Sequence, residues 1–411
     1  GNILRQIQSS PVTLHRLYAF GAKVLVLYAC FGMLAWLASR LTIAVMPAWQ
    51  RHRYLLVTGW FALLNLCVGL ANASLFPWSA TGQWSRAISG FLPSLAWQLL
   101  AMLVVIALLV LAALRLRHRL ANRTALRVAV WAVLAVGTTV TLRGMPVSVP
   151  EGTRRSERPD IIFIGIDSLR PGLVGSYGTL GYTPSLSRFV QAGHRFTDAV
   201  TPLARTYPSW MALLTGRRPA RSGVRENLMP RKQVRVVTLA DMLGAQGYQT
   251  LYATDEVRFS NIDGSYGFQK VLTPRVGASD FLLGKLNDLP LTNMLANSVI
   301  GRWLFPETYA NRAAAATYDP STFVDRLNDG VRTDERPMFL AMHLTLPHWP
   351  YRWRADETHV FSSTLDSAYA YLAAVVEADR QFDSVMKLLH RKGLLENTLV
   401  VVFSDHGEGL N

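Results

Sequence analysis

The first 150 residues of this chain contain no aspartate and no glutamate. They hold 13 of its 42 Lys and Arg residues, so they contribute 13 charges to the formal net charge of +15. The remaining 261 residues carry 29 basic and 27 acidic side chains, which is close to balance. Positive charge confined to an apolar region without acids is typical of membrane topology, and it excludes nucleic acid as a partner.

Cysteine is also scarce. The two cysteines, Cys30 and Cys67, both lie in long apolar stretches. The part of the chain after residue 150 therefore has no intramolecular disulfide, although the topology argued below places it outside the cytoplasm.

Long uncharged apolar stretches fill the acid-free region, and each approaches the ~20 residues that cross a bilayer. We expect four spans within a membrane domain of residues 1–143, at about 24–48 (broken by Arg40), 54–75, 91–114 and 128–142.

The loops between these stretches alternate in charge. Arg51 and Arg53 lie in the first loop, five basic residues lie between 115 and 123 in the third, and the second holds only Arg86. By the positive-inside rule the first and third loops are cytoplasmic. We therefore predict a multi-pass protein of a bacterial-type inner (cytoplasmic) membrane, with its later domain on the periplasmic or extracellular side.

The N-terminal segment does not fit four spans, because Arg5, Arg16 and Lys23 would then lie outside. The chain also begins at Gly1. We expect a further span upstream. The alternative is that Gly1 is a cloning remnant and these cations simply lie outside.

Residues 144–159 lack periodicity and combine Pro, Gly and charge, which predicts a linker. From residue 160 onward strand-like and helix-like segments alternate, which predicts an α/β domain with a mostly parallel sheet and helices on both faces. The expected segments are strands 161–166, 249–253, 337–343 and 398–403, and helices 184–193, 208–215, 238–246 and 366–390.

Polar residues follow two of these strands directly. Asp167 comes after strand 161–166, and Asp405 and His406 come just after strand 398–403. The carboxyl ends of parallel strands meet at one edge of a sheet. Oxygen and imidazole ligands that converge there predict a divalent metal site.

Thr206 opens a stretch, Thr206–Gly216, that places a hydroxyl before an apolar run with helical spacing. A nucleophile at a helix N-terminus lies in a positive field that suits an anionic substrate. A metal on its oxygen would lower the pKa of the hydroxyl. Taken alone, the pattern is also that of a helix N-cap.

In this order and context the motifs resemble the alkaline phosphatase/sulfatase superfamily from about residue 157 to the end. The matching motifs are Ile166-Asp167-Ser168-Leu169-Arg170, Thr183-Pro184-Ser185-Leu186, Thr206–Gly216, Thr215–Pro219, Ser222–Asn227, Thr238–Leu243, Pro347–Tyr351 and Ser404–Glu408. The resemblance implies an alkaline-phosphatase-like fold with a metal shell of Asp167, Thr206, Asp405 and His406. It also makes Thr206 the nucleophile, and His348 the contact to the substrate oxyanion or the leaving group.

Four departures separate the chain from sulfate-ester hydrolases of that superfamily. Thr206 stands where sulfatases oxidise Cys or Ser to formylglycine, and its β-methyl group would give a ketone instead. Trp210 replaces an arginine, and Ser168 replaces the second of two aspartates. The usual Lys-x-His pair is absent as well.

These departures resemble the threonine-dependent branch, which contains lipoteichoic acid synthase and the phosphoethanolamine and phosphoglycerol transferases. The resemblance implies transfer of a phospholipid head group, phosphoethanolamine or phosphoglycerol, through phospho-Thr206 to a cell-envelope glycan or lipid. One divalent metal is expected, Zn or Mn, with Mg or Ca as second choices. Two alternatives stay open: a membrane-bound phosphodiesterase or sulfatase-like hydrolase, and a catalytically silent lipid-binding regulator.

Further candidates for substrate binding flank the motifs. They are His343 and His348 at a strand exit, Arg205 beside Thr206, Arg170 and Arg217. Superfamily members continue past the Asp-His motif, so we expect the catalytic domain, residues 160–411, to lack its C-terminal part.

Overall fold

The computed structural model describes residues 11–76, 79–82, 157–175, 181–227, 229, 236–257, 260–274, 280–298, 300–332, 334–351 and 367–410. The chain divides into two compact units. The catalytic unit holds Pro150–Asn287 and Ala296–Asn411 together with Gly1–Thr13, and the membrane unit holds Leu14–Val149 together with Asp288–Leu295.

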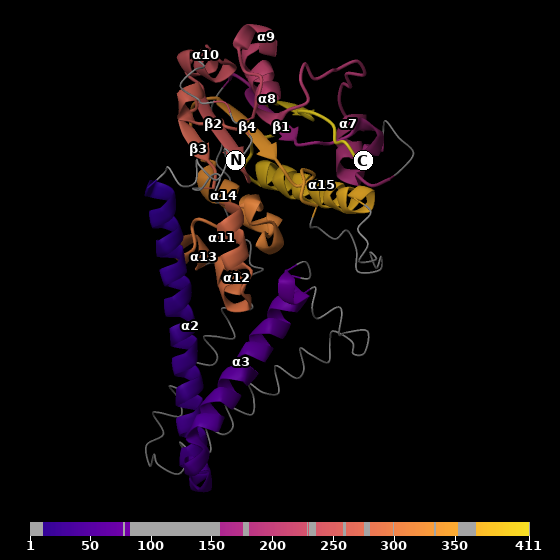
Figure 1. The fold of residues 1–411 in the computed structure, drawn as a ribbon. Coiled ribbons are helices and arrows are strands. Elements are labelled where there is room, and N and C mark those ends of the chain that lie inside the picture. The colour runs from indigo at the N-terminus through magenta and orange to yellow at the C-terminus, as the bar shows by residue number, and fades with distance from the viewer. Residues whose placement is uncertain are drawn as a thin grey trace. The chain divides into compact units, whose positions relative to one another are not determined.

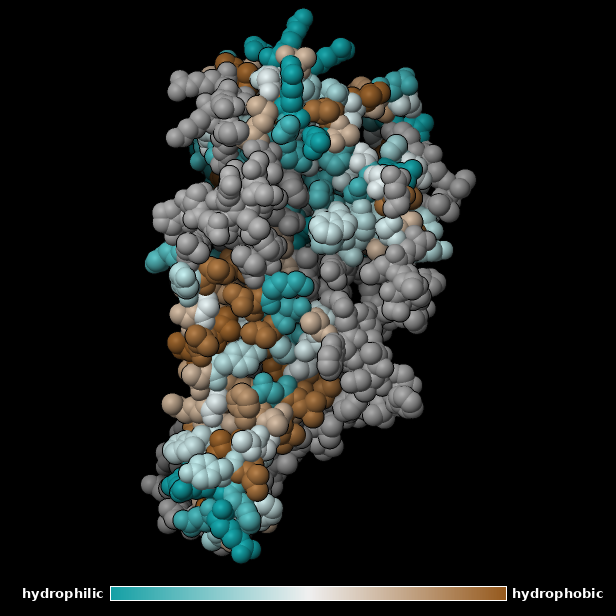
Figure 2. Space-filling model, viewed as in Figure 1, coloured by the Kyte–Doolittle hydropathy of each residue, from teal (hydrophilic) through white to brown (hydrophobic). Residues whose placement is uncertain are grey.

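The membrane unit contains two long apolar helices, α2 (Pro11–Val45) and α3 (Arg53–Leu75), joined by the short helix η1 (Pro47–His52). Two stretches, Leu17–Ala44 and Pro47–Leu75, have the length and hydropathy of a membrane span. Figure 2 shows hydrophobic side chains over these helices, and Leu25, Val26 and Met33 are among the exposed ones. The first two predicted spans thus fall on helices.

The predicted spans 91–114 and 128–142 lie outside the described residues. The count of four spans therefore stays a prediction.

A polar cluster follows the end of α3. Asn72 is fully buried, and its Nδ2 donates to Ser79 Oγ (3.1 Å) and to Thr81 Oγ1 (2.6 Å). Asn293, from the Asp288–Leu295 segment, donates from Nδ2 to Asn72 Oδ1 (2.8 Å). Asp288 of the same segment accepts from the Ala80 amide at 3.1 Å. A segment distant in sequence is thus bonded to the end of the second apolar helix.

The catalytic unit is built on a five-stranded parallel sheet in the order β3-β2-β4-β1-β5 (Figure 1). The strands are β1 (Asp160–Ile166), β2 (Gln249–Thr254), β3 (Lys270–Leu272), β4 (Met338–Leu344) and β5 (Thr398–Phe403). Its described α helices are α7 (Pro184–Gln191), α8 (Thr206–Thr215), α9 (Pro219–Ser222), α10 (Leu239–Ala245), α11 (Asp280–Asn287), α13 (Gly301–Leu304), α14 (Pro320–Gly330) and α15 (Ser367–Arg391). Helix α12 (Pro290–Ala296) belongs, except for its last residue, to the membrane unit. The 3₁₀ helices are η4 (Pro171–Leu173), η6 (Gly264–Tyr266) and η7 (Arg312–Thr317).

Side chains alternate between the two faces of the sheet, and each face has its own helices. Ile161 and Phe163 of β1 join a cluster with Trp210 of α8 and Ala240 of α10. Helices α7 and α14 both pack against α15, and Figure 1 shows α15 on the other side of the sheet. The sequence-based prediction of a parallel α/β domain with helices on both faces is confirmed for this unit.

Candidate active site

Asp167 follows the last residue of β1, and its amide donates to Leu344 O of the neighbouring strand (2.9 Å). Ser168, which comes next, has a positive φ of 59°. Its hydroxyl donates to Asp167 Oδ1 (2.8 Å) and its amide donates to Asp405 Oδ1 (3.2 Å). A left-handed serine is strained by about 1–3 kcal/mol. Here the strained turn lets one residue fix two carboxylates.

His343 comes from β4, a strand that is buried along its whole length. In the parallel register it lies opposite Gly165 of β1. Its Nε2 lies 3.3 Å from Asp167 Oδ2 and 3.7 Å from Asp405 Oδ2. Ligand atoms of the three side chains lie within 4.8 Å of one another, and all three residues are buried. We call Asp167, His343 and Asp405 the buried centre.

The buried centre fits a divalent cation. Asp405 Oδ1 accepts from the amides of Ser168 and His406 (2.9 Å for the latter). Asp405 Oδ2 and both ring nitrogens of His343 are buried without a hydrogen bond within the described part of the chain. Buried polar atoms are rarely left unsatisfied, and a metal is a standard partner for such a set. Two carboxylates and an imidazole suit Zn or Mn.

Thr206 is the first residue of α8 and is fully buried. Its Oγ1 lies 3.3 Å from His406 Nε2. The N-cap residue of α8 is Arg205, so Thr206 is not the cap that the pattern alone allowed. His406 Nδ1 lies 2.8 Å from Gly407 O, a bond that requires the proton on Nδ1. In the neutral imidazole Nε2 is then free to accept a proton or to bind a metal.

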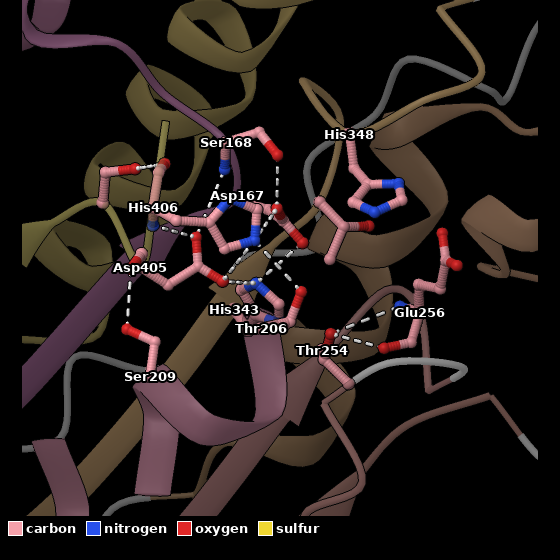
Figure 3. Close-up of polar contacts among 12 residues, drawn as sticks. Asp167, Ser168, Thr206, Ser209, Thr254, Glu256, His343, His348, Asp405 and His406 are labelled. Carbon is pink, nitrogen blue, oxygen red and sulfur yellow. Dashed lines mark hydrogen bonds and ion pairs between the residues drawn. The ribbon is translucent and has the colours of Figure 1, made fainter. Parts of the chain in front are cut away.

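The four residues predicted as the metal shell are therefore brought together (Figure 3). His406 Nε2 lies 3.6 Å from Asp167 Oδ1 and 3.8 Å from Asp405 Oδ2. His343, predicted as a substrate contact, joins them. With only 1% of its side chain exposed, it faces the two carboxylates rather than a bound substrate.

The two carboxyls of the centre differ in their pKa shifts. Burial raises the pKa of Asp167, but the nearby His348, His343 and His406 outweigh that effect and hold it well below its usual value. Burial and the Asp167 charge raise the pKa of Asp405 to about 6, although His343 and His406 act in the opposite direction. The centre thus holds one firm anion and one carboxyl that protonates in mild acid.

A family model described as Sulfatase matches residues 159–411. The chain belongs to the sulfatase family.

Among curated relatives, human arylsulfatase A is 29% identical over 299 residues, which cover 64% of this chain and 55% of that protein. The ulvan-active sulfatase of Formosa agariphila is 23% identical over 281 residues, 61% of this chain and 51% of that protein. The chain spans about half the length of these relatives.

Solved structures that resemble this chain include the lipoteichoic acid synthase LtaP from Listeria monocytogenes, at 16% identity. For LtaP the TM-score is 0.39, with 66% of this chain and 62% of that chain covered. The C-terminal periplasmic domain of EcEptC from Escherichia coli matches at 16% identity and a TM-score of 0.41, with 64% and 69% covered.

Trp210 stands where sulfatases carry an arginine, and the structure shows what this residue does instead. It is fully buried, and its ring lies 5.0 Å from the His343 ring and 5.3 Å from that of Phe403. A Cβ on Gly165 would lie 2.5 Å from Trp210 Cζ2. Glycine at 165 therefore makes room for the indole that packs on His343.

The remaining predicted residues lie around the centre or away from it. His348 is on the loop after β4, close enough to lower the pKa of Asp167, and is drawn beside the cluster in Figure 3. Arg170 and Arg205 are exposed on the segments that follow Asp167 and precede Thr206. Arg217 lies beyond the other end of α8, ~16 Å from Thr206 by helix rise, so it is not brought to this site.

The role of His343 was missed because the sequence does not show which strands are neighbours. One signal was present: β4 places a single histidine in an otherwise apolar run, Met338–Leu344. A buried imidazole needs a partner, and the order β4-β1-β5 supplies Asp167 from the neighbouring strand β1 and Asp405 from β5, one strand further on.

Proposed function

We propose that this protein is a membrane-anchored, metal-dependent phosphotransferase that moves a phospholipid head group through a phospho-Thr206 intermediate. The observation that carries the proposal is Thr206 itself. It is a buried hydroxyl at the N-terminus of α8, 3.3 Å from His406 Nε2, at the position where sulfatases need a residue that becomes an aldehyde. A threonine hydroxyl suits covalent phosphoryl chemistry.

The chain's own residues account for the first half-reaction. Thr206 Oγ1 attacks the phosphorus of phosphatidylethanolamine or phosphatidylglycerol, and its proton leaves to water, because His406 Nε2, which lies 3.3 Å away, is assigned to the metal. The bond from phosphorus to the diacylglycerol oxygen breaks, and that oxygen takes a proton, a role that we assign to His348. A divalent metal held by Asp167, Asp405, His406 and His343 would supply charge neutralisation and lower the pKa of the hydroxyl.

In the second half-reaction a hydroxyl of an envelope glycan or lipid attacks the phosphothreonine and Thr206 regains its proton. The two helices with the length of membrane spans support a lipid donor, because anchoring raises the effective concentration of lipid at the site.

The test uses the full-length protein in detergent with fluorescent phosphatidylethanolamine and, separately, phosphatidylglycerol. We expect labelled diacylglycerol from one lipid and its loss, by at least ~10³-fold, in Thr206→Ala. Thr215→Ala, at the other end of α8, is the matched control and should keep activity. Release that survives Thr206→Ala, or no release from either lipid, would favour the hydrolase or the silent lipid-binding protein.

A further inference from the structure

Arg312, at the start of η7, has the most enclosed cationic side chain in the described part of the catalytic unit. It is 0% exposed. Nη1 donates to Glu256 Oε2 (3.1 Å) and to Trp349 O (3.2 Å). Nη2 donates to His348 O and to Pro350 O (3.3 Å for the latter). One guanidinium thus bonds three successive carbonyls of the loop that carries His348.

This arrangement needs an arginine. A buried charge is tolerated when it is paired, and Glu256, itself 3% exposed, supplies the counter-charge. Both Nη atoms donate, whereas Nε has no hydrogen-bond partner among the described residues. The planar fork of Arg312 reaches several acceptors at fixed angles, whereas a lysine ammonium is a point charge on a flexible stem.

The start of the same loop is bonded to the neighbour of Glu256. Asp255 Oδ1 accepts from the amide of Thr345 (3.1 Å) and from its hydroxyl (2.7 Å). The Asp255 carbonyl accepts from the amide of Arg312 (2.8 Å). Asp255 therefore holds the start of the turn at Thr345 directly. Glu256 holds its end at Pro350 through Arg312.

We propose that Arg312 is a positioning residue for His348. It fixes the backbone of the loop, and Glu256 fixes Arg312, so that a half-buried histidine on a loop points at the buried centre. The inference rests on the proposed function only in assigning His348 to the leaving group. A misplacement of about 1 Å at such a group can lower a rate ~100-fold.

Two readouts test the proposal, and the first needs no activity. Hydrogen exchange followed by mass spectrometry compares the loop amides of residues 345–351 with those of β4. In Arg312→Met we expect exchange of the loop to rise at least ~10-fold while β4 keeps its protection. Arg336→Met, an exposed arginine paired with Asp334, is the matched control.

The second readout is a double-mutant cycle with His348→Ala. Arg312→Met should lower kcat ~10- to 100-fold in the native background. In the His348→Ala background the same substitution should change kcat by no more than about twofold. The kcat of Arg312→Lys should lie between those of the native protein and Arg312→Met. Because Arg312→Met leaves Glu256 charged and buried, Arg312→Met with Glu256→Gln serves as a second variant that removes both charges.

Equal losses of kcat in both backgrounds, or loop exchange that does not change, would overturn the positioning role. Exchange that rises equally in β4 would show a structural role instead. If the wild-type protein releases no diacylglycerol, the proposed donor fails, while the exchange comparison still decides for or against Arg312.

Discussion

The buried centre and the rim around it are built in opposite ways. Asp167, His343 and Asp405 lie at or next to the ends of three adjacent strands and are almost fully buried. His348, Arg170 and Arg205 lie on loops, and the two arginines are exposed. Strand register fixes the centre, whereas the rim depends on side-chain bonds such as those of Arg312. Under the proposed function, the difference separates residues that hold the metal from residues that meet the substrate.

The largest difference should appear when a variant of the centre is compared with a variant of the rim. His343→Ala removes a ligand atom, so we expect the affinity for Zn or Mn to fall more than ~100-fold, with activity lost in parallel. His348→Ala should keep its metal and lose ~10²-fold in kcat.

Metal content by mass spectrometry and kcat measured on the same samples give the answer. His390→Gln, at the exposed end of α15, is the control for both variants. Normal metal binding in His343→Ala would remove the distinction between centre and rim.

The second-largest effect concerns the pH dependence of metal affinity. Metal binding needs both carboxylates ionised, and the pKa of Asp405 is raised to about 6 in the metal-free protein. Above pH 6 this carboxyl is ionised and binding is independent of its proton. Burial lowers the pKa of His343, but Asp167 and Asp405 raise it above its usual value. Below pH 6 the protons of both Asp405 and His343 must be displaced, so affinity should fall about 100-fold per pH unit. Metal titration of the metal-free protein between about pH 4.5 and about pH 8 measures this, and Asp405→Asn should make the profile less steep.

The smallest effect tests how the packing of Trp210 on His343 supports the buried centre. Gly165→Ala would place a Cβ 2.5 Å from Trp210 Cζ2 and so displace the indole from His343. We expect a loss of about 1–3 kcal/mol in stability and a weaker metal site.

Thermal unfolding with and without metal measures both effects. Gly264→Ala, where an added Cβ meets nothing within 4 Å, is the control. Unchanged metal affinity in Gly165→Ala would mean that His343 does not depend on Trp210.

Periodicity located the regular elements well. The expected strand 398–403 coincides with β5, strand 161–166 begins one residue after β1, and strand 337–343 begins and ends one residue before β4. Helices α11 to α14, of 4 to 11 residues, were not predicted. Thr206 and the Asp-His pair were found from motifs. His343 and Arg312 were not assigned their places, because those follow from strand order and from contacts between distant segments.

The bond between Asn293 and Asn72 bears on how the protein can be dissected. A single cut in residues 144–159 would not separate the two compact units, because Asp288–Leu295 belongs with the apolar helices although it follows that cut in sequence. A fragment beginning near residue 157 would separate Asn293 from Asn72 and Asp288 from the Ala80 amide. A water-soluble catalytic fragment therefore needs a second alteration, at 288–295, as well as a new start.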